Sequence, residues 1–326
     1  MRIHVQNLSD DPQFAITPAQ WAEAAARAPD VSAGHAVTFG ETPEEFRAAI
    51  HQAEALVAQT GAVRRLFPAD APRLRLIYCT AAGLDSLAPF DWLPSGAQLL
   101  NNRGTHGAKA GEYGIMALLM LATGMPSFAT AQRAGQWTPR HGSVLAGRRV
   151  TVVGLGSLGG AVAVQAERFG MRVTGIRTRP EPHPACARVV TPDELDTVLH
   201  DTEFLVLASP LTDRTRGLLD GRRIASLPQG ANVVNIGRGA LLDQDALCDA
   251  LDSGHLSGAV LDVFVPEPVP PGHRLWTTPN LVMTPHVSAD DPATYIPLSL
   301  DIFFQNLRAF RDGAALPNRF DTARGY

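Results

Sequence analysis

Val150-Thr-Val-Val-Gly154-Leu-Gly156-Ser-Leu-Gly159 is the stretch of sequence that decides the fold. An apolar run leads into a Gly-x-Gly-x-x-Gly motif, and apolar residues at helical spacing follow at once. In such a turn the first glycine permits a tight bend, the second leaves room for a pyrophosphate, and the third lets the helix pack closely on the sheet. A helix start also offers free N–H groups to a phosphate. The stretch therefore predicts the phosphate end of a dinucleotide site. The residues assigned to it are Gly154, Gly156, Ser157, Leu158 and Gly159.

The end of the following strand, residues 172–176, indicates which dinucleotide to expect. This strand completes a βαβ unit, which argues against the alternative of a plain turn with chance glycines. An acidic residue usually binds the ribose here, but the chain has Arg177, Thr178 and Arg179, with no carboxylate before Glu181. A guanidinium pairs with a phosphate and keeps its charge, whereas a carboxylate would repel it. The sequence predicts NADP (NADPH) as the preferred cofactor, with NAD still allowed. The alternative is that one or both arginines are solvated loop residues.

Length and composition narrow the class of protein. A chain of 326 residues is long for one compact domain, so two domains are expected. It is 45% hydrophobic and 18% charged, and its net charge of −4 gives no reason to expect a nucleic-acid partner. Three scattered cysteines and no recognisable apolar leader favour a cytoplasmic protein, and residues 115–122, the most apolar stretch, are too short to span a membrane. His183 and Cys186 have ligand spacing but no second pair, so no metal site is expected.

Strand and helix patterns alternate along the whole chain, which is typical of α/β domains. A substantial α/β region precedes the dinucleotide motif, so a separate first domain is expected. The expected strands are residues 3–5, 55–58, 74–78, 151–153, 172–176, 203–207, 231–235, 258–261 and 281–283. The expected helices are residues 18–27, 43–52, 158–169, 245–251 and 292–310.

Three polar residues follow consecutive expected strands: Arg238, Glu267 and His286. The carboxyl ends of strands in a doubly wound sheet line the ligand crevice, so these side chains are expected at one edge. A histidine supplies a proton near neutral pH, a carboxylate orients its ring, and an arginine clamps a substrate carboxylate. Taken singly, each residue could be an ordinary loop residue. Their joint placement favours a catalytic site.

With these residues and several further motifs, the chain resembles the D-isomer-specific 2-hydroxyacid dehydrogenase family over nearly its whole length. The motifs are Ala82-Gly-Leu-Asp85, Asn102-Arg-Gly-Thr-His106, Glu112, Gly154-x-Gly-x-x-Gly159, Ser209-Pro-Leu-Thr212 with Thr215, Asn235-x-Gly-Arg-Gly239, Asp262-x-x-x-x-Glu267-Pro and Pro285-His286. The resemblance implies that His286 is the acid/base, that Glu267 is its carboxylate partner and that Arg238 binds substrate.

The resemblance also implies roles for residues outside the catalytic three. Ala82 and Gly83 would offer backbone N–H groups to the substrate carboxylate, and Asp262 would lie near the nicotinamide carboxamide. The full set of cofactor contacts expected beyond the glycine loop and the arginines is Ser209, Pro210, Thr215, Ile236, Gly237, Asp262, His286 and Ser288.

The family pattern implies an architecture of two doubly wound α/β domains. A flavodoxin-like substrate-binding domain, residues 1–100 plus 287–326, would be interrupted by a Rossmann cofactor domain, residues 101–286. The substrate would bind in the cleft between them. The helix from Gly111 onward would contribute to a homodimer interface.

The activity implied is reduction of a small 2-oxo acid, such as glyoxylate or hydroxypyruvate, to a D-2-hydroxy acid by NADPH, with no membrane or nucleic-acid partner. Glu267 argues against the formate dehydrogenase branch, for which the family pattern has glutamine. Two alternatives stay open. One is a dinucleotide-sensing co-regulator on the same scaffold, and the other is oxidation of another small anion such as phosphite.

Overall fold

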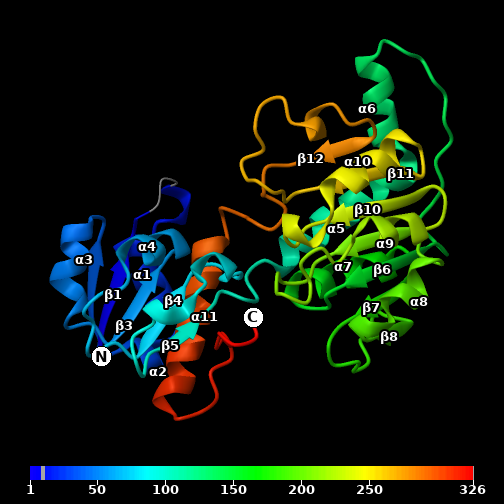
Figure 1. The fold of residues 1–326 in the computed structure, drawn as a ribbon. Coiled ribbons are helices and arrows are strands. Elements are labelled where there is room, and N and C mark those ends of the chain that lie inside the picture. Colours follow the sequence, from blue (N-terminus) through cyan, green and yellow to red (C-terminus); the bar gives the residue numbers. More distant parts are fainter. Residues whose placement is uncertain (9–11, 326) are drawn as a thin grey trace. The chain divides into compact units, whose positions relative to one another are not determined.

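The computed structural model describes residues 1–8 and 12–325 and divides into two compact units (Figure 1). Unit 1 comprises Met1–Thr105 and Asp291–Tyr326, and unit 2 comprises His106–Asp290. The chain thus enters and leaves unit 2 a few residues beyond the boundaries predicted after residues 100 and 286. Each unit is built on its own parallel sheet.

Unit 1 has a five-stranded sheet in the order β2-β1-β3-β4-β5, with every neighbouring pair parallel. This 2-1-3-4-5 order is that of flavodoxin-like sheets. The strands are β1 Arg2–Gln6, β2 Ala36–Gly40, β3 Ala55–Ala58, β4 Leu76–Cys79 and β5 Gln98–Leu100. The helices are α1 Pro18–Arg27, α2 Pro29–Ser32, α3 Pro43–Ile50, α4 Thr60–Leu66 and α11 Tyr295–Arg311.

Helices cover both faces of the unit 1 sheet. On one face, α1 and α11 pack together, with the ring centroids of Trp21 and Phe304 5.3 Å apart. On the other face, α3 and α4 bury apolar side chains such as Phe46 and Val63. The segment after unit 2 therefore completes the hydrophobic core of unit 1.

Unit 2 has a seven-stranded sheet in the order β12-β11-β10-β9-β6-β7-β8, and its neighbouring strands are parallel. Counted from β6, this is the 3-2-1-4-5-6 order of dinucleotide-binding sheets with one added strand. The strands are β6 Arg149–Val153, β7 Arg172–Ile176, β8 Arg188–Val190, β9 Phe204–Leu207, β10 Ala231–Asn235, β11 Leu256–Leu261 and β12 Leu281–Met283. The helices are α5 Gly107–Thr123, α6 Met125–Arg133, α7 Ser157–Arg168, α8 Leu195–Leu199, α9 Gly221–Ser226 and α10 Gln244–Asp252.

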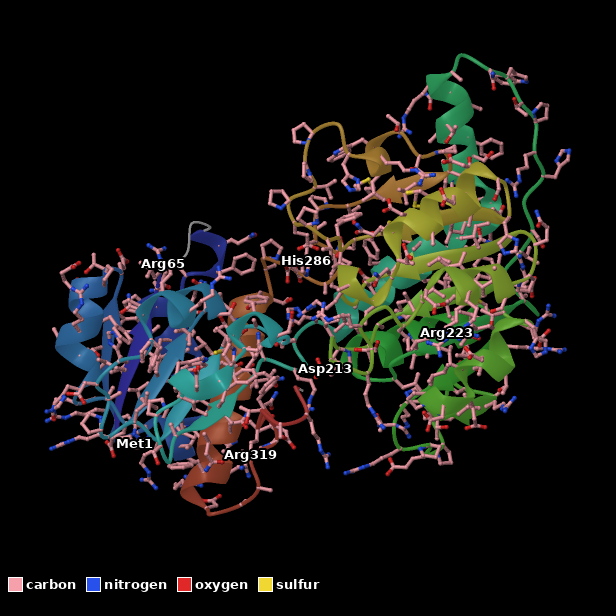
Figure 2. The ribbon with its side chains drawn as sticks, in the orientation of Figure 1. Met1, Arg65, Asp213, Arg223, His286 and Arg319 are labelled. Carbon is pink, nitrogen blue, oxygen red and sulfur yellow. The ribbon has the colours of Figure 1, made fainter. Side chains whose placement is uncertain are left out.

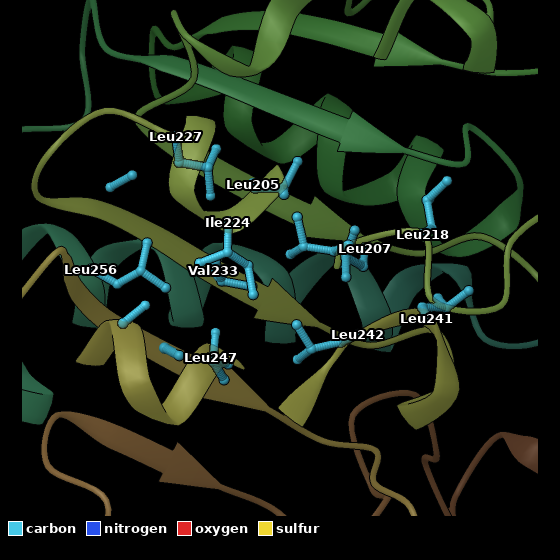
Figure 3. Close-up of a cluster of buried hydrophobic side chains, with 14 of the residues drawn as sticks. Leu205, Leu207, Leu218, Ile224, Leu227, Val233, Leu241, Leu242, Leu247 and Leu256 are labelled. Atoms are coloured by element: carbon cyan, nitrogen blue, oxygen red, sulfur yellow. The ribbon is translucent and has the colours of Figure 1, made fainter. Parts of the chain in front are cut away.

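Alternate side chains of the central strands face opposite sides of the unit 2 sheet. Val152 and Val206 pack with α5 and α7, whereas Leu205 and Leu207 pack with α8, α9 and α10. On the second face, Arg223 of α9 (labelled in Figure 2) pairs with Asp196 of α8 at 2.6 Å. Figure 3 shows the leucine-rich cluster beneath these helices. Burial on both faces explains why the central strands read as continuous apolar runs.

Helix α5 is the most apolar helix expected from the sequence, and much of it is buried against the sheet and α7. A Cβ added at Gly114 would lie 2.4 Å from Cγ2 of Val162, so the backbone of α5 approaches α7 closely there. Among the described residues, no single helix is long and apolar enough to cross a membrane. Helices α5 and α6 meet that test only as a pair, by length and composition, and they are bent by 64°.

Candidate active site

The three motif glycines occupy three different environments at the turn between β6 and α7. Gly154 has a φ of +94°, and a Cβ on it would lie 2.7 Å from the backbone of Ser209. A Cβ on Gly159 would lie 2.0 Å from the carbonyl oxygen of Gly154. A Cβ on Gly156 would meet no described atom within 4 Å. The outer glycines therefore serve the turn and its packing, and the middle one leaves space beside the backbone.

The groups around that space fit a pyrophosphate. Helix α7 begins after Gly156 without a side-chain cap, so no cap side chain occupies its first N–H groups. The hydroxyl of Ser209 is buried there and has no hydrogen-bond partner among the described residues. Thr215 supports the same loop: its Oγ1 donates to the carbonyl of Pro210 at 2.7 Å and accepts the N–H of Thr212 at 2.8 Å. Ser209 is thus presented as a donor, while Thr215 shapes the loop.

The two arginines beyond β7 have different surroundings. The guanidinium of Arg177 donates to the carbonyls of Glu181 and Pro182 and lies 3.6 Å from the Glu181 carboxylate. Arg179 is exposed and forms no ion pair with any residue in the described ranges. Thr178 between them is also exposed. Arg177 therefore closes its own loop, and Arg179 presents a guanidinium to solvent.

Arg238 lies in a tight loop after β10. Nδ2 of Asn235 donates to the carbonyl of Arg238 at 3.0 Å, and its Oδ1 accepts the N–H of Gly237 at 3.1 Å. A Cβ at Gly239 would lie 2.2 Å from the backbone of Phe264, and one at Gly237 would lie 2.9 Å from the carbonyl of Ser209. Ile236 is buried in the core. The glycines thus let the loops after β9, β10 and β11 pack backbone to backbone, as the strand-end argument requires.

Glu267 and His286 form a hydrogen-bonded pair. Nδ1 of His286 lies 2.9 Å from Oε2 of Glu267, and Oε1 of Glu267 accepts the N–H of Phe264 at 2.7 Å. His286, which is labelled in Figure 2, follows β12, and its side chain is half exposed. Because Nδ1 donates to the carboxylate, Nε2 is the ring atom that can exchange a proton with a substrate. From the sequence, these two residues are expected at one edge of the sheet only because each follows a strand. In the structure they are joined by a direct hydrogen bond.

Asp262 holds the loop that carries His286. Its carboxylate is fully buried and accepts the N–H groups of Val287 and Ser288, each at 2.9 Å, and the hydroxyl of Thr284 at 2.6 Å. Its carbonyl accepts the N–H of His286, also at 2.9 Å. Both carboxylate oxygens are thus used within the protein. The predicted contacts of Asp262 and of buried Ser288 to the cofactor stay predictions.

Four residues of this region carry no predicted role: Tyr113, Thr284, His106 and Asp290. His106 is buried, and its Nδ1 donates to the carbonyl of Ala289 at 3.1 Å and lies 3.6 Å from the Asp290 carboxylate. Burial lowers the pKa of His106 and raises the pKa of Asp290. The charge of His286 lowers the pKa of both groups by a smaller amount. Among the described residues, no group of three or more histidines, cysteines and carboxylates could hold a metal ion. The Asn102–His106 motif was the only signal in the sequence for His106.

Ala82 and Gly83 follow β4 in unit 1. The carbonyl of Ala82 accepts Nδ2 of Asn101 at 3.0 Å. The N–H groups of Ala82 and Gly83 make no hydrogen bond within the described part of the chain. These N–H groups are thus suited to an anion, and their role toward a substrate carboxylate stays a prediction.

The chain is similar in sequence and in fold to several known proteins. The chain is 28% identical over 260 residues to glyoxylate/hydroxypyruvate reductase A of Salmonella paratyphi B, covering 78% of this chain and 82% of that protein. A D-isomer-specific 2-hydroxyacid dehydrogenase from Xanthobacter autotrophicus Py2, solved with NADPH, superposes with a TM-score of 0.83 at 30% identity, over 99% of both chains. The NADPH-dependent glyoxylate/hydroxypyruvate reductase of Sinorhizobium meliloti, solved with NADP, gives 0.80 at 25% identity over 100% of both chains.

Residues 115–288 match the family described as D-isomer specific 2-hydroxyacid dehydrogenase, NAD binding domain. This range covers most of unit 2, including the glycine loop, the strand ends and the His286–Glu267 pair. The chain therefore belongs to the D-isomer-specific 2-hydroxyacid dehydrogenase family, and unit 2 is its dinucleotide-binding domain.

Proposed function

We propose that the protein reduces a small 2-oxo acid, such as glyoxylate or hydroxypyruvate, to a D-2-hydroxy acid with NADPH. The observation that carries this proposal is the hydrogen bond of His286 to Glu267 at 2.9 Å, on the sheet edge that also carries Arg238 and the glycine loop. The relatives from Salmonella and Sinorhizobium, described as glyoxylate/hydroxypyruvate reductases, support the choice of substrate class.

In the proposed reaction His286 is the proton donor. Glu267 accepts a hydrogen bond from the Nδ1–H of His286, which stabilises the imidazolium and leaves Nε2–H to donate to the substrate carbonyl oxygen. Arg238 binds the substrate carboxylate. NADPH, held by the glycine loop and Ser209, supplies the hydride when bound. The half-exposed ring of His286 then regains its proton from water.

The preference for NADPH is assigned to Arg179. Its guanidinium is exposed and makes no ion pair with the described residues, whereas Arg177 is held by the Glu181 loop. Binding a 2′-phosphate would cost Arg179 no existing ion pair, whereas Arg177 would have to give up its contact with the Glu181 carboxylate. The phosphate is therefore expected to bind Arg179 at the lower cost in free energy. Two structural neighbours solved with NADPH or NADP support this choice.

A homodimer formed through α5, α6 and the segment after them is also proposed. Met116, Leu119 and Met125 on these helices are exposed, and Trp137 and Val144 on the following segment are 96% and 72% exposed. Figure 1 shows α6 and that segment extending from the rest of unit 2. Large exposed apolar side chains that lie together usually mark an interface. A second copy of the chain would cover them.

A cytoplasmic location is proposed on the state of the thiols. Cys79, Cys186 and Cys248 are all free. Free cysteines are typical of reducing compartments, where NADPH is also kept reduced. A reductive direction for the reaction suits such a location.

The test is a panel of 2-oxo acids with NADPH and with NADH, followed by nicotinamide absorbance. Turnover of glyoxylate or hydroxypyruvate with NADPH is expected. Tight NADPH binding without turnover of any 2-oxo acid would contradict the proposal and favour a dinucleotide-sensing protein. Reduction of NADP by phosphite, with no 2-oxo acid turned over, would move the activity to another small anion.

A further inference from the structure

A chain of hydrogen bonds runs from helix α5 to the loop that carries His286. The hydroxyl of Tyr113 lies 2.6 Å from Oγ1 of Thr284, and Thr284 donates its own proton to Oδ1 of Asp262 at 2.6 Å. A hydroxyl has a single proton, so Thr284 can only accept from Tyr113. The direction of the chain is therefore fixed: Tyr113 donates to Thr284, and Thr284 donates to Asp262.

The end of this chain controls an unusual backbone conformation. His286 has a φ of +57°, in the left-handed region that residues other than glycine rarely adopt. Asp262 holds that conformation from both sides, because its carbonyl binds the N–H of His286 and its carboxylate binds the N–H groups of the two residues that follow. Strained backbone of this kind persists only where its surroundings over-determine it.

The donor at the start of the chain keeps its proton. The Tyr113 side chain is nearly buried, and burial, assisted by the negative charge of Asp262, raises the pKa of Tyr113 to about 12. The hydroxyl therefore donates at every pH at which the protein is expected to work. Such a chain is polarised in one direction, which strengthens each of its bonds.

The helix that carries Tyr113 also touches the cofactor loop. Cβ atoms added at Gly107, Gly111 and Gly114 would lie 3.4 Å from Oγ of Ser157, 3.3 Å from the carbonyl of Ala161 and 2.4 Å from Cγ2 of Val162. Ser157 is the first residue of α7, directly after the motif glycine Gly156. One face of α5 thus lies against the start of α7, and Tyr113 connects the same helix to the His286 loop.

We propose that Tyr113 is a positioning residue for the acid/base group: through Thr284 and Asp262 it holds His286 in the conformation that meets Glu267, at a fixed place relative to the cofactor loop. The catalytic role of His286 in this inference rests on the proposed function. The hydrogen bonds themselves are observed and do not depend on it. The Tyr113 hydroxyl hydrogen-bonds Thr284 and reaches His286 only through Thr284 and Asp262, so its effect is expected on kcat rather than on cofactor affinity.

Two variants break this chain of hydrogen bonds, and a third variant keeps it. Tyr113→Phe deletes the first donor, Thr284→Val replaces the central hydroxyl by a methyl group, and Thr284→Ser retains it. Loosening the geometry by a fraction of an ångström is expected to lower kcat about tenfold in the first two, with KM for NADPH changed by less than about twofold. Thr284→Ser is expected to stay close to wild type. The double variant Tyr113→Phe with Thr284→Val is expected to be no slower than Thr284→Val alone, because both changes break the same chain of hydrogen bonds.

Thr202→Val is the matched control. Thr202 makes the same kind of buried hydrogen bonds, to the carbonyl of Val198 at 2.8 Å and to Oγ1 of Thr151 at 2.7 Å. It precedes β9, at the opposite end of the parallel sheet from His286. Its loss is expected to lower the melting temperature and to leave kcat unchanged.

A readout independent of turnover separates this inference from the proposed function. The Nδ1 proton signal of His286, assigned with His286→Asn, is compared by NMR in wild type and in Tyr113→Phe. A looser contact with Glu267 is expected to move that signal upfield and to speed the exchange of the proton with water in the variant. Tyr113→Phe with wild-type kcat and an unchanged Nδ1 proton signal, whatever its melting temperature, would overturn the inference. If wild type turns over no 2-oxo acid, the proposed function fails and the NMR signal still decides the role of Tyr113.

Discussion

Oε2 of Glu267 lies 2.9 Å from Nδ1 of His286, while Oε1 of the same carboxylate accepts the backbone N–H of Phe264 at 2.7 Å. One oxygen anchors the carboxylate to the loop after β11, and the other orients the imidazole after β12. The pair therefore joins two neighbouring strand ends into one unit. A histidine held in this way is set in one tautomer, with Nε2 available for proton transfer.

Glu267→Gln tests that unit. Glutamine keeps the size of the side chain, but its neutral amide does not stabilise an imidazolium. We expect kcat to fall by about tenfold to a hundredfold at neutral pH. Steady-state kinetics with a 2-oxo acid and NADPH measure this fall. An unchanged kcat would show that Glu267 does not support the proton donor.

Arg179→Ala is expected to weaken the use of NADPH. Loss of an exposed guanidinium that pairs with a phosphate should lower kcat/KM for NADPH by about tenfold or more, and leave kcat/KM for NADH nearly unchanged. Arg177→Ala serves as the comparison, because that guanidinium is engaged by Glu181. Steady-state kinetics with both cofactors decide between them. A larger loss in Arg177→Ala would transfer the role to Arg177.

Acid is expected to destabilise the fold through buried histidines. His4 in β1 is buried, and burial lowers its pKa despite hydrogen bonds to Gln6 and Thr38; burial lowers the pKa of His106 as well. The unfolded chain therefore binds more protons than the folded protein once pH falls below about 6.5, so stability decreases from there downward. Melting temperatures between roughly pH 7.5 and 5 check this. His4→Gln should reduce the slope, and a slope as steep as in wild type would count against the assignment.

Trp137→Ser tests the proposed dimer surface. Wild type is expected to have nearly twice the 34.8 kDa mass of one chain in size-exclusion chromatography with light scattering. Removing a 96% exposed tryptophan from a contact surface should shift that mass toward the monomer at low concentration, because aromatic anchors dominate such interfaces. A wild-type chain that is monomeric at every concentration would reject this surface as a dimer contact.

The sequence predicts the parts of this protein that depend on local patterns. The glycine turn, the central strands and the strand-end positions of Arg238, Glu267 and His286 all follow from spacing and apolar runs. The strands β2, β5 and β8 were not predicted, and each lies at the edge of its sheet. Two of them, Gln98–Leu100 and Arg188–Val190, have only three residues, and an edge strand is partly exposed, so its apolar pattern is weak.

The supporting hydrogen bonds of the site could not be predicted from the sequence. Tyr113 and Thr284 are 171 positions apart, and no periodic pattern connects them. The difference between Arg177 and Arg179 depends on how the loop to Glu181 folds back, which is a tertiary property. His106 belongs to a predicted motif, but its contact with Ala289 appears only when the two ends of unit 2 are placed together.

The central claim is that His286 donates the proton in a 2-oxo acid reduction. His286→Asn is the sharpest test, because asparagine tolerates the left-handed backbone at this position and cannot act as the acid. Turnover of NADPH with glyoxylate or hydroxypyruvate is measured beside NADPH binding by fluorescence. We predict a kcat lower by about a hundredfold to ten-thousandfold with NADPH affinity retained. A variant that binds NADPH and keeps near-normal kcat would contradict the account.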